Sequence, residues 1–175
     1  YEGHALYCFC GERTCNAICR PSYRKIIKNE VIQLNIGARV GGYSSSVGLP
    51  VSFGKLPERK KRLVEFGLEA HVKTMELMKA GRPAGDMVRE YEEWVKSRGF
   101  GQFMLYGPCH GIGMMEVERP WIESTSTFAL EKNMTFQVDT FFADTDFGLR
   151  WENGVRVTER GVERLSEKYM KVVEL

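Results

Sequence analysis

Three residues that lie far apart in the chain, His110, Asp139 and Glu152, are its main candidates for chemistry. The two carboxylates belong to a segment typical of a strand, a turn at residues 144–147 and a second strand. Such a turn places Asp139 opposite Glu152, where like charges repel unless a cation, a proton or a hydrogen-bond donor lies between them. We therefore interpret the pair as a candidate functional site, with a solvated surface pair as the alternative.

The histidine of this set lies in a glycine-rich turn, Tyr106-Gly107-Pro108-Cys109-His110-Gly111-Ile112-Gly113. Glycines allow another group to approach the imidazole closely, and an imidazole can act as a metal ligand or as a proton shuttle. A structural hydrogen bond is an equally common role for a single histidine. Cys109 points to the opposite face of an extended chain, so a Cys–His nucleophilic pair is not expected.

Two polar residues, Asn35 and Ser46, lie eleven positions apart in a second hairpin pattern. A β-branched segment ends at Gly41 and Gly42, and extended chain follows, which predicts two strands joined by a tight turn. A turn centred near residues 40 and 41 places Asn35 roughly opposite Ser46. Both side chains then share one face of the strand pair.

The order of these five residues resembles the Asp, Asp, His, Glu, Glu ligand order of the pita-bread metallopeptidases, the family of prolidase, aminopeptidase P, methionine aminopeptidase and creatinase. The resemblance covers about residues 11–165. It implies an α+β pita-bread fold in which helices cover a curved antiparallel sheet, with residues 1–175 as a single, partial catalytic-type domain. It rests on Asn35-Ile36-Gly37-Ala38, Gly42-Tyr43-Ser44-Ser45-Ser46, His110-Gly111-Ile112-Gly113, and Glu152 followed by Val155-Arg156-Val157-Thr158-Glu159-Arg160-Gly161.

The chain departs from the family pattern at the ligand positions. Asn35 and Ser46 stand where the resemblance implies aspartates, and Asp139 stands where it implies a glutamate. The family's second histidine falls on Val117 or Glu118, depending on a one-residue gap. In the family, two divalent ions acidify a water molecule and polarise the scissile carbonyl. Neutral oxygens compensate poorly for the dehydration of such ions, so a dinuclear metal site is not expected.

The expected cofactor is therefore none, or one weakly bound divalent ion (Mn, Co, Fe or Zn) on His110, Asp139 and Glu152. Creatinase resembles this fold and works without metal, using a histidine in an early loop. The matching position in this chain is Ile18 or Cys19, so no histidine is available there. The creatinase mechanism cannot be carried over intact.

Two classes of function stay open at this point. The first is a C–N bond hydrolase for a small amide, guanidino or Xaa-Pro substrate, in which His110, Asp139 and Glu152 are catalytic. Its substrate-binding residues would be Tyr43, Asn35 and Ser46. The second is a non-catalytic pita-bread domain that binds a peptide or a protein. Fold does not decide between them.

Composition limits the remaining possibilities. A chain of 175 residues with 43% hydrophobic residues suits one domain with a sizeable core. A net charge of +2 gives no reason to expect nucleic acid or an anionic membrane as a partner. Neither a membrane-spanning stretch nor a signal peptide is recognisable, so a cytoplasmic location is expected. The five cysteines lack the spacing of a zinc knuckle, and we expect free, mostly buried thiols.

Two helices are expected to pack against the sheet. The first begins at Pro57 and ends near Gly81, and its apolar stripe leaves His71 on the polar side as a structural residue. The second is capped by Asp86 and ends before Gly99. The resemblance implies a further pair of helices before the first strand, which is missing here. Either the chain is a fragment or another subunit completes the sheet, and a homodimer is the expected assembly.

The double substitution Asn35→Asp and Ser46→Asp is predicted to restore tight binding of divalent metal, because it returns two anionic ligands to the site. The measurement is the elemental metal content per chain after equilibration with Mn, Co, Fe and Zn ions and desalting. A His110→Ala version of the variant should lose the retained metal. A folded double variant that retains none would mean that the hairpin alignment or the pocket shape is wrong.

Overall fold

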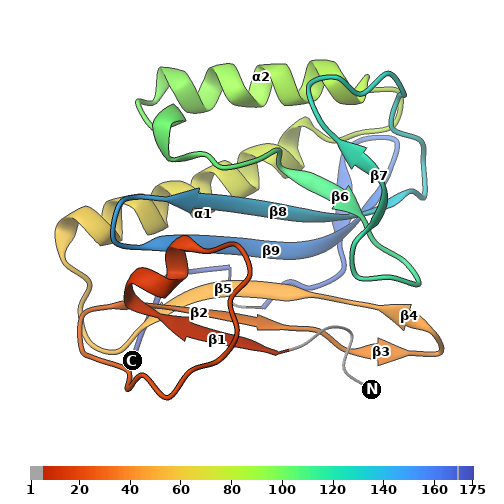
Figure 1. Ribbon diagram of the computed structural model, residues 1–175. Helices are drawn as coiled ribbons and strands as arrows, with labels where there is room; N and C mark the ends of the chain where they lie inside the picture. Colours follow the sequence, from red (N-terminus) through yellow and green to blue (C-terminus); the bar gives the residue numbers. More distant parts are fainter. Residues whose placement is uncertain (1–5, 169) are drawn as a thin grey trace.

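The computed structural model describes residues 6–168 and 170–175, which form a large sheet with two helices packed near one end (Figure 1). The helices are α1 (Glu58–Leu77) and α2 (Ala84–Ser97), and the short 3-10 turns are η1 (Gly11–Cys15) and η2 (Gly101–Phe103). The strands are β1 (Tyr7–Cys10), β2 (Val31–Ile36), β3 (Arg39–Val40), β4 (Tyr43–Ser44), β5 (Val47–Ser52), β6 (Cys109–Gly111), β7 (Glu118–Ile122), β8 (Thr135–Ala143), β9 (Gly148–Val157), β10 (Val162–Arg164) and β11 (Val173–Glu174).

Nine strands form one sheet in the order β1-β2-β5-β9-β8-β6-β7, with β10 paired to β9 and β11 paired to β5. Every pairing is antiparallel except that of β11 with β5. Strands β3 and β4 make a separate small hairpin. The predicted α+β architecture with an antiparallel sheet is confirmed. Neither helix in the described part of the chain has both the length and the apolar character needed to cross a membrane.

The first hairpin has a different register from the predicted one. Both Gly41 and Gly42 have positive φ angles, +59° and +91°. A tight two-residue turn of this kind needs positive φ at both positions, which glycine adopts without strain. The turn centre therefore lies between residues 41 and 42, not at residues 40 and 41. Asn35 consequently pairs with Gly48, and the prediction that it lies opposite Ser46 was wrong.

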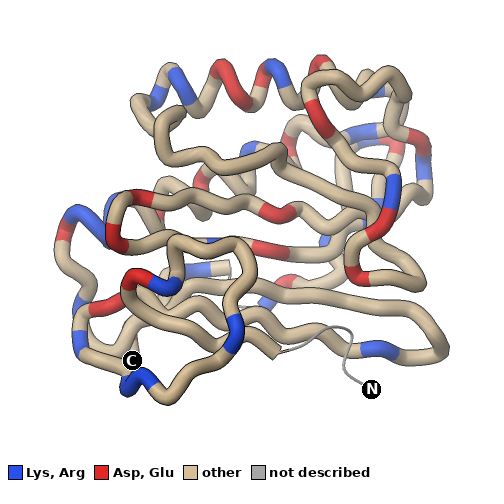
Figure 2. Tube along the Cα trace, in the orientation of Figure 1, with Lys and Arg blue, Asp and Glu red and all other residues tan. Residues whose placement is uncertain are grey.

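The second hairpin has the predicted register. Asp139 of β8 lies opposite Glu152 of β9, and the connecting turn spans residues 144–147. The two side chains are buried, with 6% and 1% of their surface exposed. The alternative of a solvated surface pair is thereby excluded. Figure 2 shows an acidic segment near the middle of each of these two strands.

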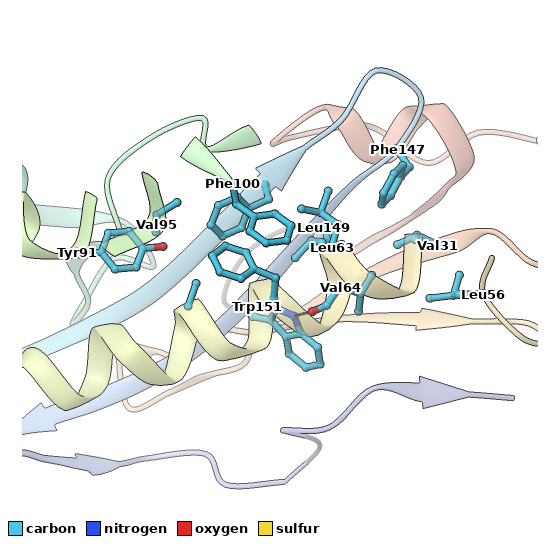
Figure 3. Packing of buried hydrophobic residues seen from close by; sticks show 13 residues of the cluster. Val31, Leu56, Leu63, Val64, Tyr91, Val95, Phe100, Phe147, Leu149 and Trp151 are labelled. Atoms are coloured by element: carbon cyan, nitrogen blue, oxygen red, sulfur yellow. Dashed lines mark hydrogen bonds between the residues drawn. The ribbon is translucent and has the colours of Figure 1, made fainter. Parts of the chain in front are cut away.

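Side chains of strand β9 alternate between the core, on the side of α1, and the opposite face of the sheet. Leu149 and Trp151 point toward α1, and the Trp151 indole nitrogen donates to the Val64 carbonyl at 3.1 Å (Figure 3). Gly67 lets the helix approach, because a Cβ there would lie 2.4 Å from Leu149. Arg150 and Glu152 point the other way, since side chains alternate along a strand.

The helix boundaries differ from the predicted ones at two points. Helix α1 begins at Glu58 after Pro57, as expected, but it ends at Leu77 rather than near Gly81. The amide of Gly81 donates to the Leu130 carbonyl, and that of Ala80 donates to the Thr158 carbonyl, so both lie outside the helix. Helix α2 begins at Ala84, which places Asp86 in its first turn instead of at its cap.

His71 is completely buried, and its predicted place on the polar side of the helix was wrong. Its Nε2 lies 2.9 Å from Asn153 Oδ1, and its Nδ1 lies 3.1 Å from Thr140 Oγ1. The Asn153 amide nitrogen donates to Ser166, so the Asn153 oxygen must accept from His71 Nε2–H. The neutral ring thus joins α1 to the two central strands. Burial lowers the pKa of His71 to about 4 from its usual 6.5.

Stability is predicted to fall in acid because of His71. The unfolded chain takes up this proton near pH 6.5, whereas the folded protein takes it up only near pH 4. The free energy of unfolding therefore decreases by about 3 kcal/mol as the pH falls from 6.5 to 4. Urea unfolding of the wild type and His71→Gln across this range measures the difference. Parallel pH profiles for the two proteins would contradict it.

Candidate functional site

A cavity of about 310 Å³ opens on the face of the sheet opposite α1. His110, Asp139 and Glu152 all line it, together with Asn35, so the structure brings together residues that the sequence separates widely. The positions come from four strands, β6, β8, β9 and β2. Strand pairing brings three of them together. Glu152 lies opposite Asp139, and His110 lies opposite Gln137, which is two residues from Asp139 on β8.

Asp139 has two partners that the sequence analysis did not identify, an ion-pair partner and a hydrogen-bond donor. Arg150 Nε lies 3.1 Å from Asp139 Oδ1, and the Tyr106 hydroxyl donates to Oδ2 at 2.8 Å. Arg150 also donates to the Tyr106 oxygen at 2.7 Å, which closes the triangle. Burial and then the Asp139 carboxylate raise the pKa of the Tyr106 phenol, so it remains a donor. The arginine neutralises Asp139 within the site.

The sequence did contain a signal for this arginine. Arg150 precedes Glu152 by two residues on the same predicted strand, so the two-residue period places both on one face. Only 8% of its surface is exposed, and its guanidinium lies 5.7 Å from the centre of the Phe141 ring. A buried arginine requires a partner. Strand alternation alone thus indicated a cation beside the acidic pair.

Glu152 is neutralised by a different means. Burial first, and then the Asp139 carboxylate, raise the pKa of Glu152 well above its usual value. Arg150 and a hydrogen bond from Ser46 act in the opposite direction with smaller effect. Asn35 Nδ2 donates to Oε2 of the same carboxyl group. Oε1 is buried without a hydrogen bond of normal geometry from the described residues.

Gln33, which the sequence analysis did not single out, determines which way Asn35 points. The Arg150 backbone amide can only donate, and it donates to Gln33 Oε1 at 2.7 Å. Gln33 Nε2 must then face Asn35 Oδ1, at 2.9 Å. The Asn35 oxygen is occupied, and its NH₂ group is turned toward Glu152. Asn35 therefore presents a donor to the cavity where the family resemblance implied an anionic oxygen.

His110 presents a nitrogen lone pair. Its Nδ1 lies 2.9 Å from the Gly111 carbonyl oxygen, which can only accept, so Nδ1 carries the hydrogen. In the neutral ring, Nε2 is left as an acceptor or metal ligand. The Trp121 ring lies edge-on at 5.7 Å between centroids. The His110 side chain is only 5% exposed.

Glu116 completes the acceptor set, and the sequence analysis missed it. One ligand atom from each of His110, Glu116 and Glu152 lies within 4.8 Å of the others, the one such group among the described residues. Glu116 comes from the loop after β6, where Glu118 accepts from the Met115 amide at 3.0 Å and so shapes the turn. Loop conformation of this kind leaves no periodic signal in sequence.

The remaining predicted positions divide between two places. Ser46 is buried and hydrogen-bonds Glu152, but it lines a different cavity. Tyr43 is 66% exposed at the tip of the β3–β4 hairpin and also belongs to that second cavity. The prediction that Tyr43 lies in the same site as His110 was therefore wrong.

Of the two alternatives at each position implied by the resemblance, one residue lines the first cavity and the other does not. Ile18, rather than Cys19, lines it, and Val117 does so rather than Glu118. The two positions at which the resemblance implies histidines thus carry aliphatic side chains. All five cysteines are free thiols, but the expectation that most of them are buried was wrong, because only Cys10 and Cys109 are buried.

The paired Asp139 and the occupied Asn35 do not fit a dinuclear metal centre. The carboxylate of Asp139 is bound by Arg150 and Tyr106, and the oxygen of Asn35 is bound by Gln33. The ligand types at His110, Glu116 and Glu152 do suit one divalent ion. The same acceptors also suit a cationic group of an organic ligand.

Comparisons with known proteins agree with this fold. The sequence model of metallopeptidase family M24 matches residues 1–159. The chain is similar to an Xaa-Pro dipeptidase of Pyrococcus furiosus, with 25% identity over 83% of this chain and 42% of that protein. An uncharacterized peptidase of Staphylococcus haemolyticus is 27% identical over 89% of this chain and 45% of its own length.

The solved structures give the same result. A dipeptidase of Pyrococcus horikoshii superposes with a TM-score of 0.93 at 26% identity, covering 99% of this chain and 49% of that one. A prolidase of Thermococcus sibiricus gives 0.93 at 26% identity, covering 99% and 48%. The expected pita-bread fold is confirmed by these neighbours. The chain spans about half the length of the relatives it matches.

Replacing Arg150 by methionine is predicted to lower the free energy of unfolding by about 3 kcal/mol, because it leaves the buried Asp139 carboxylate without its cation. Adding Asp139→Asn should recover most of this loss. Urea unfolding of the single and double variants measures the effect. Arg156→Met is a matched control on the same strand, because its partner Glu163 is exposed, and it should cost less than about 1 kcal/mol. Additive losses in the double variant would contradict the pairing.

Proposed function

Since the chain belongs to metallopeptidase family M24, we propose that it uses the family's cavity to bind the amino group of a small ligand or peptide, without a dinuclear metal centre. The observation that carries this proposal is the acceptor set of His110, Glu116 and Glu152. It lies beside Asp139, which pairs with Arg150 and Tyr106, and Asn35, whose oxygen accepts from Gln33. This arrangement does not favour the binding of two metal ions, and so it does not favour hydrolysis by a two-metal site.

The spacing of the acceptors suits an ammonium group. The three ligand atoms lie within 4.8 Å of one another. A central atom can therefore lie within about 2.8 Å of all three, which includes the length of a charge-assisted hydrogen bond. An ammonium group carries three N–H donors, one for each acceptor.

The charges of the cavity favour a cation as well. Asp139 is balanced by Arg150, which leaves Glu116 and Glu123 as additional acidic residues of the lining, without a basic residue of the same lining to match them. A bound ammonium would also stabilise the ionised form of Glu152, because an opposite charge nearby favours it. Trp121, 45% exposed, offers an apolar surface for the rest of the ligand.

One divalent ion on the same three residues is the second candidate, and the convergence of one imidazole and two carboxylates favours it. His110, Glu116 and Glu152 would hold the ion, which would polarise a carbonyl or acidify a water when bound. In that case Asp139 and Arg150 would act beside it, on a small amide, guanidino or Xaa-Pro substrate. In this single-ion site, Glu116 would be the third ligand in place of Asp139, which the sequence analysis had predicted for that role.

The prediction concerns binding of a free amino group. Metal-free protein should bind the dipeptide Ala-Pro and should bind its N-acetylated form at least ten-fold more weakly, because acetylation removes the charge and two donors. Isothermal titration calorimetry after treatment with EDTA measures both affinities. Glu116→Gln should weaken binding of the free dipeptide by roughly ten-fold. Glu93→Gln on α2 changes the net charge equally and should have no effect.

Two results would count against the proposal. Equal affinity for the free and acetylated dipeptides would show that the cavity does not recognise an amino group. Retention of about one Mn, Co, Fe or Zn ion per chain, lost in both His110→Ala and Glu116→Gln, would instead support the single-ion site. Screens for hydrolysis of dipeptides would then follow.

A further inference from the structure

A second cavity, of about 300 Å³, lies where β5 and β10 diverge at the edge of β9. Its walls come from the β3–β4 hairpin, the loop at Ile112 and Gly113, and the segment at Leu165 and Ser166. None of the twelve described residues that line it is charged, in contrast to the acidic first cavity. The two cavities therefore differ in the charge of their walls.

The floor of this cavity carries an oxygen that lacks a partner. Gln137 is completely buried, and its Nε2 donates to the Ser46 backbone carbonyl at 2.7 Å. A carbonyl can only accept, so the amide cannot be turned round, and Oε1 must point the other way. That oxygen has no hydrogen bond from the described residues. A buried acceptor without a donor is costly, which indicates that a donor from outside belongs there.

Three hydroxyl groups of the cavity lining, those of Thr135, Ser44 and Ser45, are directed away from this oxygen. Thr135 donates to the Ile112 carbonyl at 2.7 Å. Ser44 donates to the Met114 carbonyl at 3.3 Å, and Ser45 donates to the Ala38 carbonyl at 3.3 Å. Their hydrogens are all directed at backbone oxygens.

Glycine at position 154 leaves room for about one methyl group beside this buried oxygen. A Cβ there would lie 3.4 Å from Gln137 Oε1 and 3.6 Å from Leu165 Cδ1, so even one methyl group would cover the acceptor. These are ordinary contact distances, and the φ angle of Gly154 is not in the left-handed region. An alanine is therefore tolerated by the backbone while it occupies the ligand's place.

We infer that this second cavity is a binding subsite for an uncharged N–H donor carried on a branched aliphatic group, such as an aliphatic carboxamide. The donor would bond Gln137 Oε1. An ammonium is disfavoured because no carboxylate lines the cavity to balance it. Val47, Ile112 and Leu165 provide aliphatic contact for the alkyl part, and Leu165 is 56% exposed at the opening. This site does not depend on the amine-binding function proposed above.

The test is a titration followed by ¹⁵N–¹H NMR with three probes of nearly equal shape. Isobutyramide should cause saturable shifts of the Ser45, Gly113 and Gly154 amide signals. Isobutyrate, which has no N–H and is charged at neutral pH, should cause none at these positions. N-Methylisobutyramide distinguishes a peptide-like N–H, which would still shift them, from a requirement for a primary amide.

Matched variants identify the acceptor. Gln137→Met removes the oxygen and should weaken isobutyramide binding at least five-fold. Gly154→Ala keeps Gln137 and its hydrogen bond to Ser46, and it should weaken binding similarly by covering the oxygen. Glu116→Gln should leave this titration unchanged even though it weakens the amine site. Absence of saturable shifts in the wild type, an equal response to isobutyrate, or undiminished binding in both Gln137→Met and Gly154→Ala would overturn the inference.

Discussion

The site depends on one constraint: two carboxylates, Asp139 and Glu152, are held opposite each other on buried strands. Both cannot remain charged there without compensation, because burial and mutual repulsion disfavour the second charge. The surrounding residues solve the problem differently for each carboxylate. Arg150 and Tyr106 stabilise the charge of Asp139, whereas Glu152 is held near neutrality with Asn35 as its donor.

These compensations explain why the family fold does not by itself establish the family chemistry. The repulsion between two buried carboxylates can be balanced either by bound metal ions or by cationic and hydrogen-bonding groups of the protein. Here the donors are already in place, and Gln33 orients Asn35 through a chain of hydrogen bonds that begins at the Arg150 backbone. The acceptors left over, at His110 and Glu116, define a cavity that suits a cation of a ligand.

The same strands also connect the site to the core. Alternate residues of β9 face α1 and the cavity, so packing of Leu149 and Trp151 fixes the direction of Arg150 and Glu152. On the α1 side, His71 bonds Thr140 and Asn153, the neighbours of the two carboxylates. Movement of the helix would therefore disturb both strands at the positions where the site is built.

The sequence alone determined the features that follow from local periodicity and short motifs. These were the family, the antiparallel sheet, the Asp139–Glu152 register, and the meeting of His110 with that pair. Tertiary structure decided the features that depend on side chains from distant segments. It shifted the first hairpin because both turn glycines take positive φ, and it separated Tyr43 from the His110 cavity. It also brought in Gln33, Tyr106 and Glu116, whose hydrogen bonds and loop positions have no period that sequence could reveal. Strand alternation indicates which face a residue occupies, but only the packed structure determines which partner it meets there.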